Sequence, residues 1–121
     1  MTITIKEKSY DLHFGLDFIA YLDKKYHIVE NGYQLGNGLP HVITQIQIGN
    51  PLILLDLIAA ATITGTKPAP EEVKNYIETE ADIEVLTDDF LSAFEKAPTT
   101  RFTLKKLGLL EDAKPGTKAK K

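Results

Sequence analysis

Three histidines are the side chains in this sequence best suited to binding a metal ion, because imidazole is a common zinc ligand. His13, His27 and His41 are spaced fourteen residues apart, and no two of them have the short spacing that places ligands on one face of a helix or strand. A zinc site needs three or four ligands that converge on one point. The pattern therefore favours surface or structural histidines over a metal centre.

The segment GNGLPH, residues 36–41, contains half of the glycine pattern that opens a dinucleotide-binding loop. Gly36 and Gly38 have the correct spacing, but His41 stands at the third glycine position and no strand of adequate length precedes the segment. No lysine follows a glycine run, as a phosphate-binding loop would require. The segment therefore predicts a turn and not a nucleotide site.

Carboxylates are dense between residues 78 and 89, and paired carboxylates can bind a metal ion or transfer protons. Asp88 and Asp89 are adjacent on an expected helix, where neighbouring side chains point about 100° apart and do not converge. Ser9 and Ser92 lack the context of a catalytic serine, and the chain has no cysteine. We therefore expect a protein that is not an enzyme and needs no cofactor or metal ion.

Length and composition are those of a soluble globular chain: 121 residues, 43% hydrophobic and 26% charged. We expect one domain over residues 1–112 and a disordered, lysine-rich tail over residues 113–121. No signal peptide is expected at the amino end.

The charge is unevenly distributed, with a net charge of −8 over residues 71–95 and +6 over residues 96–121. These regions can attract each other across the surface, or the basic end can dock on an acidic partner. Nucleic-acid binding is disfavoured, because the pI is about 5.6 and only Phe102 in the basic region could stack on a base.

Hydrophobic periodicity predicts the elements of the first third of the chain. Alternating apolar residues predict a β-hairpin over residues 2–14, whose turn, KEKS, has no glycine or asparagine and so no evident type. From Phe14 to Tyr26 the apolar residues recur every four positions, which indicates an amphipathic helix. Asn31-Gly32 and Asn37-Gly38 are turn signals. Residues 27–38 are therefore expected to form either a small hairpin or a tight loop.

Helices are expected over residues 39–48, 51–63, from Pro70 onward, over 82–97 and after Pro98. Asn50 is the expected N-cap of the second of these, with Pro51 as its first residue. Thr99 or Thr100 is expected to cap the last helix, whose apolar side chains are Phe102, Leu107 and Leu110. The predicted fold class is therefore α+β and mostly α, with a short N-terminal hairpin, about five to six helices and a disordered basic C-terminal tail.

The longest apolar stretch, IQIGNPLILLDLIAAATI, covers residues 46–63 and contains one charge, Asp56. Pro51 and the Gly49-Asn50 turn divide it. The part after the turn, about 13 residues, reaches only about 20 Å as a helix, against about 30 Å of membrane hydrocarbon. The stretch therefore predicts the central helix of a soluble domain and no membrane partner.

The helices over residues 39–48 and 51–63 carry more apolar side chains than one buried stripe requires. The surplus predicts an apolar surface that binds a partner, and the alternative is that all of these side chains are core. The candidates for this surface are Leu39, Val42, Ile46, Leu52, Leu55 and Leu57.

Three motifs follow one another along the chain: FGL (14–16) running into LDKKY (22–26); GNP (49–51) before an apolar helix ending in AAT (60–62); and FL (90–91) leading to EKAP (95–98). In this order and spacing they resemble the tail assembly chaperone family of long-tailed phages and prophages of Gram-positive bacteria. The resemblance covers about residues 3–107, and the turn KEKS departs from it, since a glycine would be expected there.

The resemblance implies a non-enzymatic assembly factor in the cytoplasm of the bacterial host that is absent from the finished virion. Such proteins bind the tape measure protein, a very long, mostly helical and aggregation-prone chain, keep it soluble and help recruit the major tail protein. The resemblance also allows self-association and a longer product made by frameshifting. The alternatives are a structural tail completion or connector protein of the virion and a small regulatory module.

Overall fold

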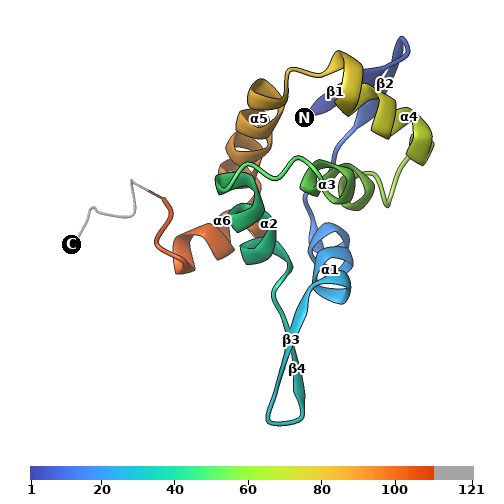
Figure 1. Cartoon of the computed structure of the whole chain (residues 1–121). Helices are drawn as coiled ribbons and strands as arrows, with labels where there is room; N and C mark the ends of the chain where they lie inside the picture. Colours follow the sequence, from blue (N-terminus) through green and yellow to red (C-terminus); the bar gives the residue numbers. More distant parts are fainter. Residues whose placement is uncertain (111–121) are drawn as a thin grey trace.

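The computed structural model describes residues 1–110, which form two β-hairpins separated by one α-helix and followed by five more (Figure 1). The predicted fold class, an N-terminal hairpin followed by about six helices, is confirmed. The predicted end of the domain at residue 112 and the predicted disordered tail lie outside the described residues. In chain order the elements are β1 (Thr2–Ile5), β2 (Lys8–Asp11), α1 (Leu16–Lys25), β3 (His27–Glu30), β4 (Tyr33–Gly36), α2 (Gly38–Gln47), α3 (Ile53–Ala61), α4 (Pro70–Asn75), the π-helical turn η1 (Tyr76–Glu80), α5 (Ile83–Lys96) and α6 (Pro98–Lys106).

The hairpin β1–β2 is amphipathic, as its alternating sequence predicts. Ile3 pairs with Tyr10 on the buried face, and Thr4 pairs with Ser9 on the exposed face. Lys6 and Glu7 form the two-residue turn, with φ angles of 52° and 67°. Two left-handed residues define the type I′ turn, which normally takes Asn-Gly because side chains with a Cβ are strained there. The sequence could not reveal the turn type because its two residues are atypical.

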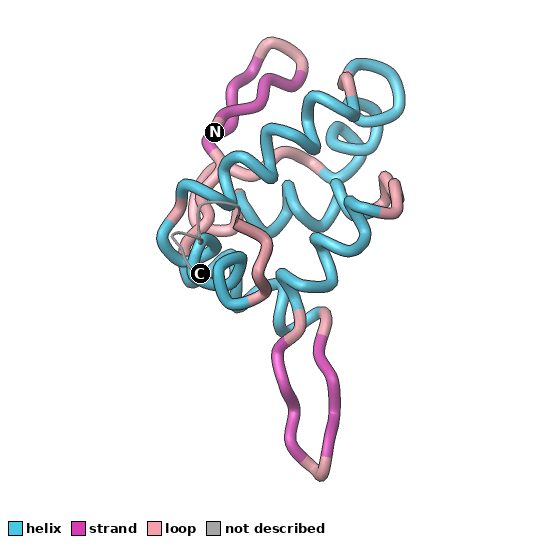
Figure 2. The backbone as a smooth tube through the Cα atoms, turned by 90° about the vertical axis from the view of Figure 1, so that its left-hand side faces the viewer, coloured by secondary structure: helices cyan, strands magenta, loops and turns pink. Residues whose placement is uncertain are grey.

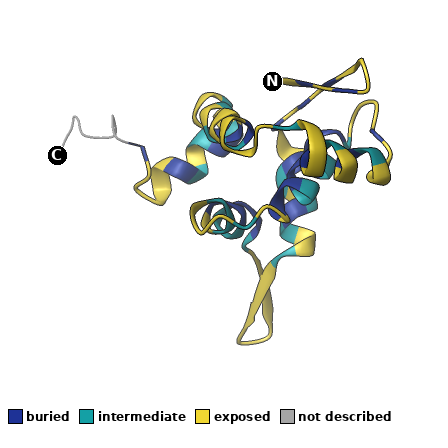
Figure 3. Cartoon of the chain, turned by 45° about the horizontal axis from the view of Figure 1, so that its top comes forward, coloured by how far each residue is buried: buried dark blue, intermediate teal, exposed yellow. Residues whose placement is uncertain are grey.

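Helix α3 is the centre of the fold, with six of its nine residues buried. Helices α1, α2 and α4 all pack against it. Figure 3 shows the buried residues on the inward sides of these helices and the exposed residues outside. The expected central helix is therefore confirmed. Among residues 1–110, no helix combines the length and the apolar character needed to cross a membrane.

Four phenylalanines join the start of α1 to α5. The Phe14 ring meets those of Phe18, Phe94 and Phe90 edge to face, with centroid distances of 5.0, 5.5 and 6.0 Å. Edge-to-face pairs of aromatic rings add stability beyond the area that they bury. The cluster fixes α5 against the N-terminal part of the chain.

Helix α6 begins at Pro98 with Ala97 as its N-cap, and not at the predicted cap, Thr99 or Thr100. Thr100, expected as a cap, is fully buried, and its hydroxyl donates a 2.7 Å hydrogen bond to the carbonyl of Phe94. Of the three apolar side chains expected on this helix, Phe102 is 64% exposed, and Leu107 and Leu110 follow its last residue, with Leu107 46% exposed and Leu110 buried; Leu104 is the buried leucine of α6. The predicted cap is wrong because the hydroxyls of Thr99 and Thr100 donate to the carbonyl groups of Phe14 and Phe94 and do not accept from N–H groups of the helix.

The prediction that Asn50 is the N-cap of α3 is wrong, because the N-cap is Leu52, although Asn50 shapes the turn before the helix. The Asn50 side-chain oxygen accepts a 3.2 Å hydrogen bond from the Leu52 N–H. The residues before the helix form hydrogen bonds of the 3₁₀ type, between residues three apart, such as that from the Leu54 N–H to the Pro51 carbonyl at 3.1 Å. Regular α-helix therefore starts at Ile53 and not at Pro51.

The two glycines of GNGLPH allow α2 to approach α1 closely. A Cβ on Gly38 would lie 2.5 Å from the Leu22 carbonyl carbon, and one on Gly36 would overlap the Asp23 carboxylate. That carboxylate accepts a 2.8 Å hydrogen bond from the Gly38 N–H at the start of α2. The glycine pattern therefore serves the close packing of α2 against α1.

Gly38→Ala is expected to lower the free energy of unfolding by about 1–3 kcal/mol, because the new methyl group forces backbone atoms of α1 and α2 apart. Urea denaturation measures the change. Gly65→Ala is the control, since a Cβ at Gly65 meets nothing within 4 Å. Equal losses in the two variants would show that steric contact with α1 is not the cause.

Replacing both turn residues, Lys6→Asn together with Glu7→Gly, is expected to raise the free energy of unfolding by about 1 kcal/mol, because Asn-Gly adopts the left-handed conformations with less strain. The ion pair between Lys6 and Glu72, at 3.9 Å and exposed, is lost in this variant and contributes little. Thermal and urea unfolding test the expectation, and a variant no more stable than the parent contradicts it.

Candidate functional site

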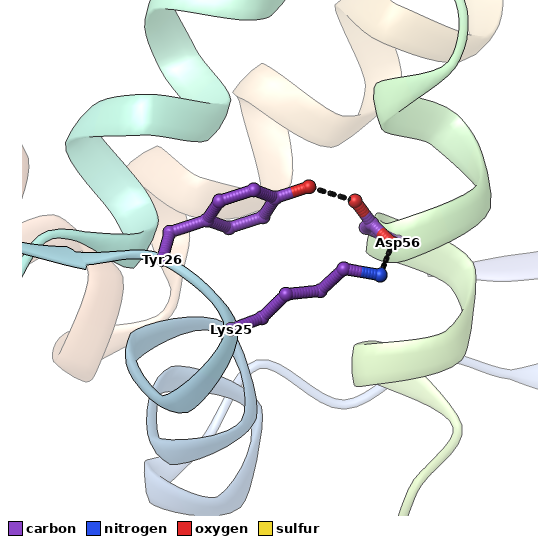
Figure 4. Close-up of polar contacts among 3 residues, drawn as sticks. All are labelled: Lys25, Tyr26 and Asp56. Atoms are coloured by element: carbon purple, nitrogen blue, oxygen red, sulfur yellow. Dashed lines mark hydrogen bonds and ion pairs between the residues drawn. The ribbon is translucent and has the colours of Figure 1, made fainter.

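Asp56, the single charge of the apolar stretch, binds two side chains from the C-terminal end of α1 (Figure 4). The Lys25 Nζ lies 2.7 Å from one carboxylate oxygen, and the Tyr26 hydroxyl donates a short hydrogen bond to the other. The Asp56 side chain is only 15% exposed. A carboxylate so enclosed needs partners to offset its lost hydration, and these two contacts attach α1 to α3.

The same contacts shift the proton affinity of both partners upward. Burial, with the hydrogen bond to Asp56 in addition, raises the pKa of Tyr26 to about 12. The hydrogen bond to Asp56 raises the pKa of Lys25 above its usual value. The Tyr26 ring also stacks on His41 of α2, with ring centroids 4.0 Å apart. The raised pKa keeps Tyr26 protonated at neutral pH, and its contacts with Asp56 and His41 hold α1, α2 and α3 together.

An apolar groove lies between α3 and the segment α4–η1, and we call it the α3–α4 groove. It consists of a cavity of about 460 Å³ and a smaller one of about 160 Å³, with Leu55 and Lys74 in the walls of both. Most of the lining side chains are apolar, and exposed charged residues line both cavities. The lining residues are Tyr21, Pro51, Leu52, Leu55, Ile58, Ala59, Thr62, Lys67, Pro68, Pro70, Glu71, Val73, Lys74, Ile77 and Glu78.

Three of the six side chains predicted to form a partner-binding surface are in the core. Leu39, Val42 and Leu57 are 2%, 0% and 0% exposed, so the expectation that they present an apolar surface is corrected. The reason is that α2 and α3 are covered by α1 and by each other, so an apolar surplus on one helix is buried by its neighbours.

The other three predicted side chains reach the surface, in two places. Leu52, 68% exposed, and Leu55, partly buried, both line the α3–α4 groove. Ile46, also partly buried, lines a separate cavity of about 390 Å³ between the end of α2 and the start of α5. The structure therefore brings together two of the six, and their role in binding stays a prediction.

The groove also contains residues that the sequence did not suggest. Tyr21, Val73 and Ile77 come from α1, α4 and η1, so their proximity to Leu55 arises only from the packing of these elements. No local pattern distinguishes them from ordinary core positions.

The hairpin β3–β4 is a second exposed apolar feature, and it too was not predicted as a surface. All eight of its strand residues are exposed, and Figure 3 shows it as uniformly exposed. Four large apolar side chains lie on it: Ile28 (47% exposed), Val29 (67%), Tyr33 (72%) and Leu35 (48%). The apolar residues around Asn31-Gly32 were the available signal in the sequence. They do not reveal whether the helices cover the hairpin or leave it exposed.

Comparison with known protein families supplies a match over nearly the whole described chain. A family model described as "Phage tail assembly chaperone protein, TAC" matches residues 2–108. No curated protein and no solved structure matches the chain. The matched range includes β1 through α6, and so both the α3–α4 groove and the β3–β4 hairpin.

Asp56→Asn is expected to lower the free energy of unfolding at neutral pH by about 1–3 kcal/mol, because two hydrogen bonds lose their charged acceptor. In the parent protein, the folded pKa of Tyr26 (about 12) exceeds its ordinary value of 10.0. Its contribution to stability is therefore complete below pH 10 and is lost as the pH rises toward 12, and the raised pKa of Lys25 acts in the same direction.

This alkaline loss of stability is expected to be shallower in Asp56→Asn. Urea denaturation at a series of pH values measures it. Asp88→Asn, at an exposed aspartate of α5, is the control and should keep the pH dependence of the parent. An unchanged alkaline slope in Asp56→Asn would show that the carboxylate does not couple to Lys25 and Tyr26.

Proposed function

This chain belongs to the phage tail assembly chaperone family, and from that premise we propose that it binds the tape measure protein, keeps it soluble and helps recruit the major tail protein. On this proposal it is a non-enzymatic factor that acts in the cytoplasm of the bacterial host and is absent from the mature virion.

The α3–α4 groove is the observation that supports binding of the tape measure protein. A long helical chain that has not yet assembled exposes apolar side chains at helical spacing. Such side chains bind in an apolar groove through anchors three, four and seven residues apart. The two cavities, in series along α3 and sharing Leu55, accommodate successive anchors of one helix.

The charges in the groove support a tolerant mode of binding. Lys67 and Lys74 line it together with Glu71 and Glu78, and all four are exposed. A groove with both signs of charge rejects neither acidic nor basic helices strongly, because specificity against a partner requires repulsion. That tolerance suits a chaperone that must cover many different segments of one long chain.

Leu52→Glu is expected to reduce the amount of tape measure protein that stays soluble and co-purifies when the two proteins of the same phage are co-expressed. A carboxylate at the edge of the smaller cavity cannot be buried under an apolar anchor without a large desolvation cost. Because Leu52 is 68% exposed, the fold itself should be unaffected, and thermal unfolding checks this.

Leu16→Glu is the matched control, since Leu16 is 75% exposed on α1 and does not line the groove. It should capture as much tape measure protein as the parent. If the parent itself captures none and the tape measure protein remains insoluble, the proposed function fails. If both variants capture it equally, the function stands and the groove is not the binding site.

A further inference from the structure

The β3–β4 hairpin projects from the helical part of the molecule, at the end opposite to β1–β2 (Figures 1 and 2). It has two strands of four residues each, and among the described residues neither strand pairs with a third. An isolated two-stranded hairpin is marginally stable in water, and three or more strands or a supporting surface are normally needed. Pairing with a further strand would therefore stabilise this hairpin and cover its exposed apolar residues.

The strand register places three of the four large apolar side chains on one face, together with Glu30. Ile28 pairs with Leu35, and Glu30 pairs with Tyr33, on either side of the Asn31-Gly32 turn. Side chains two residues apart share a face, and so do paired residues, so Ile28, Tyr33 and Leu35 lie together with Glu30. The other face carries Val29 and Gln34.

The register also identifies which backbone groups are free. In a hairpin with a two-residue turn, the pair next to the turn is hydrogen-bonded, and the following pair is not. Glu30 and Tyr33 are the pair next to the turn. The next pair is Val29 with Gln34, so the N–H and C=O of Gln34 point outward along the open edge of β4.

This edge differs from that of the N-terminal hairpin of the same chain. Strand β2, KSYD, carries Lys8 and Asp11, and its apolar residue Tyr10 is buried against the core. Strand β4, YQLG, has no charge and no proline, and all of its residues are exposed. Natural proteins protect edge strands with charges, proline or bulges, and an edge without them is open to pairing with another strand.

We propose that β4 pairs antiparallel with β4 of a second copy of this chain, about a two-fold axis at Gln34. Gln34 of each copy then exchanges both backbone hydrogen bonds with Gln34 of the other. Tyr33 of each copy lies opposite Leu35 of the other copy. The two hairpins then form one four-stranded sheet, with these apolar side chains on the same face. Aromatic and aliphatic side chains opposite each other stabilise such a sheet.

The charge of β4 permits pairing with a second copy of the chain, and the small area of the strand determines how strong that pairing is. Because β4 is uncharged, two copies meet along it without repulsion. Four residues per strand bury far less than the roughly 1,200 Å² of a stable interface. The pairing is therefore weak and populated at high protein concentration. This inference does not rest on the proposed function.

The substitution Gln34→Cys tests the pairing directly, because the chain contains no other cysteine. Across a hydrogen-bonded antiparallel pair the two Cα atoms lie about 5.5 Å apart, within the range that a disulfide requires. Ser9→Cys is the matched control, at the same position relative to the turn of β1–β2. Under mild oxidation, the variant at residue 34 should form a disulfide-linked dimer whose yield rises with protein concentration, and the control should form little.

The variant Gln34→Lys gives an independent measurement on the reduced protein. It places two ammonium groups opposite each other at the axis and is expected to weaken the dimer by roughly fivefold in sedimentation equilibrium, whereas Ser9→Lys leaves it unchanged. Circular dichroism verifies that each variant is folded.

Three results overturn the inference: equal cross-linking at residues 34 and 9, a parent protein that stays monomeric up to millimolar concentration, or self-association unaffected by Gln34→Lys. If the parent protein is monomeric and captures a co-expressed tail protein, and Gln34→Lys abolishes that capture, the edge of β4 pairs with a strand of the tail protein instead. The proposed function is unaffected by these results, because capture of the tape measure protein by the monomer is measured separately.

Discussion

A helix that is apolar on nearly all sides can exist in water only if other elements cover it, and α3 imposes this constraint on the rest of the structure. Helices α1, α2 and α4 pack around it and bury most of its side chains. The coverage is incomplete on the side facing α4 and η1, where Leu52 and Leu55 remain accessible. The candidate binding groove is thus the uncovered side of the central helix.

The single charge of α3 determines how α1 is held against it. Asp56 needs partners because it is mostly enclosed, and Lys25 and Tyr26 provide them from the end of α1. Tyr26 is the last residue before β3, and its carbonyl accepts the Asn37 N–H at 3.1 Å, just past β4. One electrostatic contact therefore anchors both α1 and the base of the projecting hairpin. The α3–α4 groove and the hairpin belong to different elements, which would allow a partner helix and a second copy to bind at once.

Much of the fold could be predicted because its signals are local. Hydrophobic periodicity located the helices to within a few residues, and Asn31-Gly32 indicated a turn that proved to be a hairpin. The candidate site was predicted less well: of the six leucine, valine and isoleucine side chains, two lie in the groove, one lines another cavity and three are core. Periodicity shows how apolar a helix face is, but not how many neighbours cover it.

The sequence by itself determined the types and order of the elements and the resemblance to a family, because propensities, turn residues and motif spacing depend on residues close together in the chain. Only the tertiary structure decided which apolar residues remain exposed, what Asp56 binds and why Gly38 must be glycine. Each of these depends on contacts between residues distant in sequence, such as Lys25 with Asp56 and Leu22 with Gly38. Such contacts exist only once the chain has folded around α3.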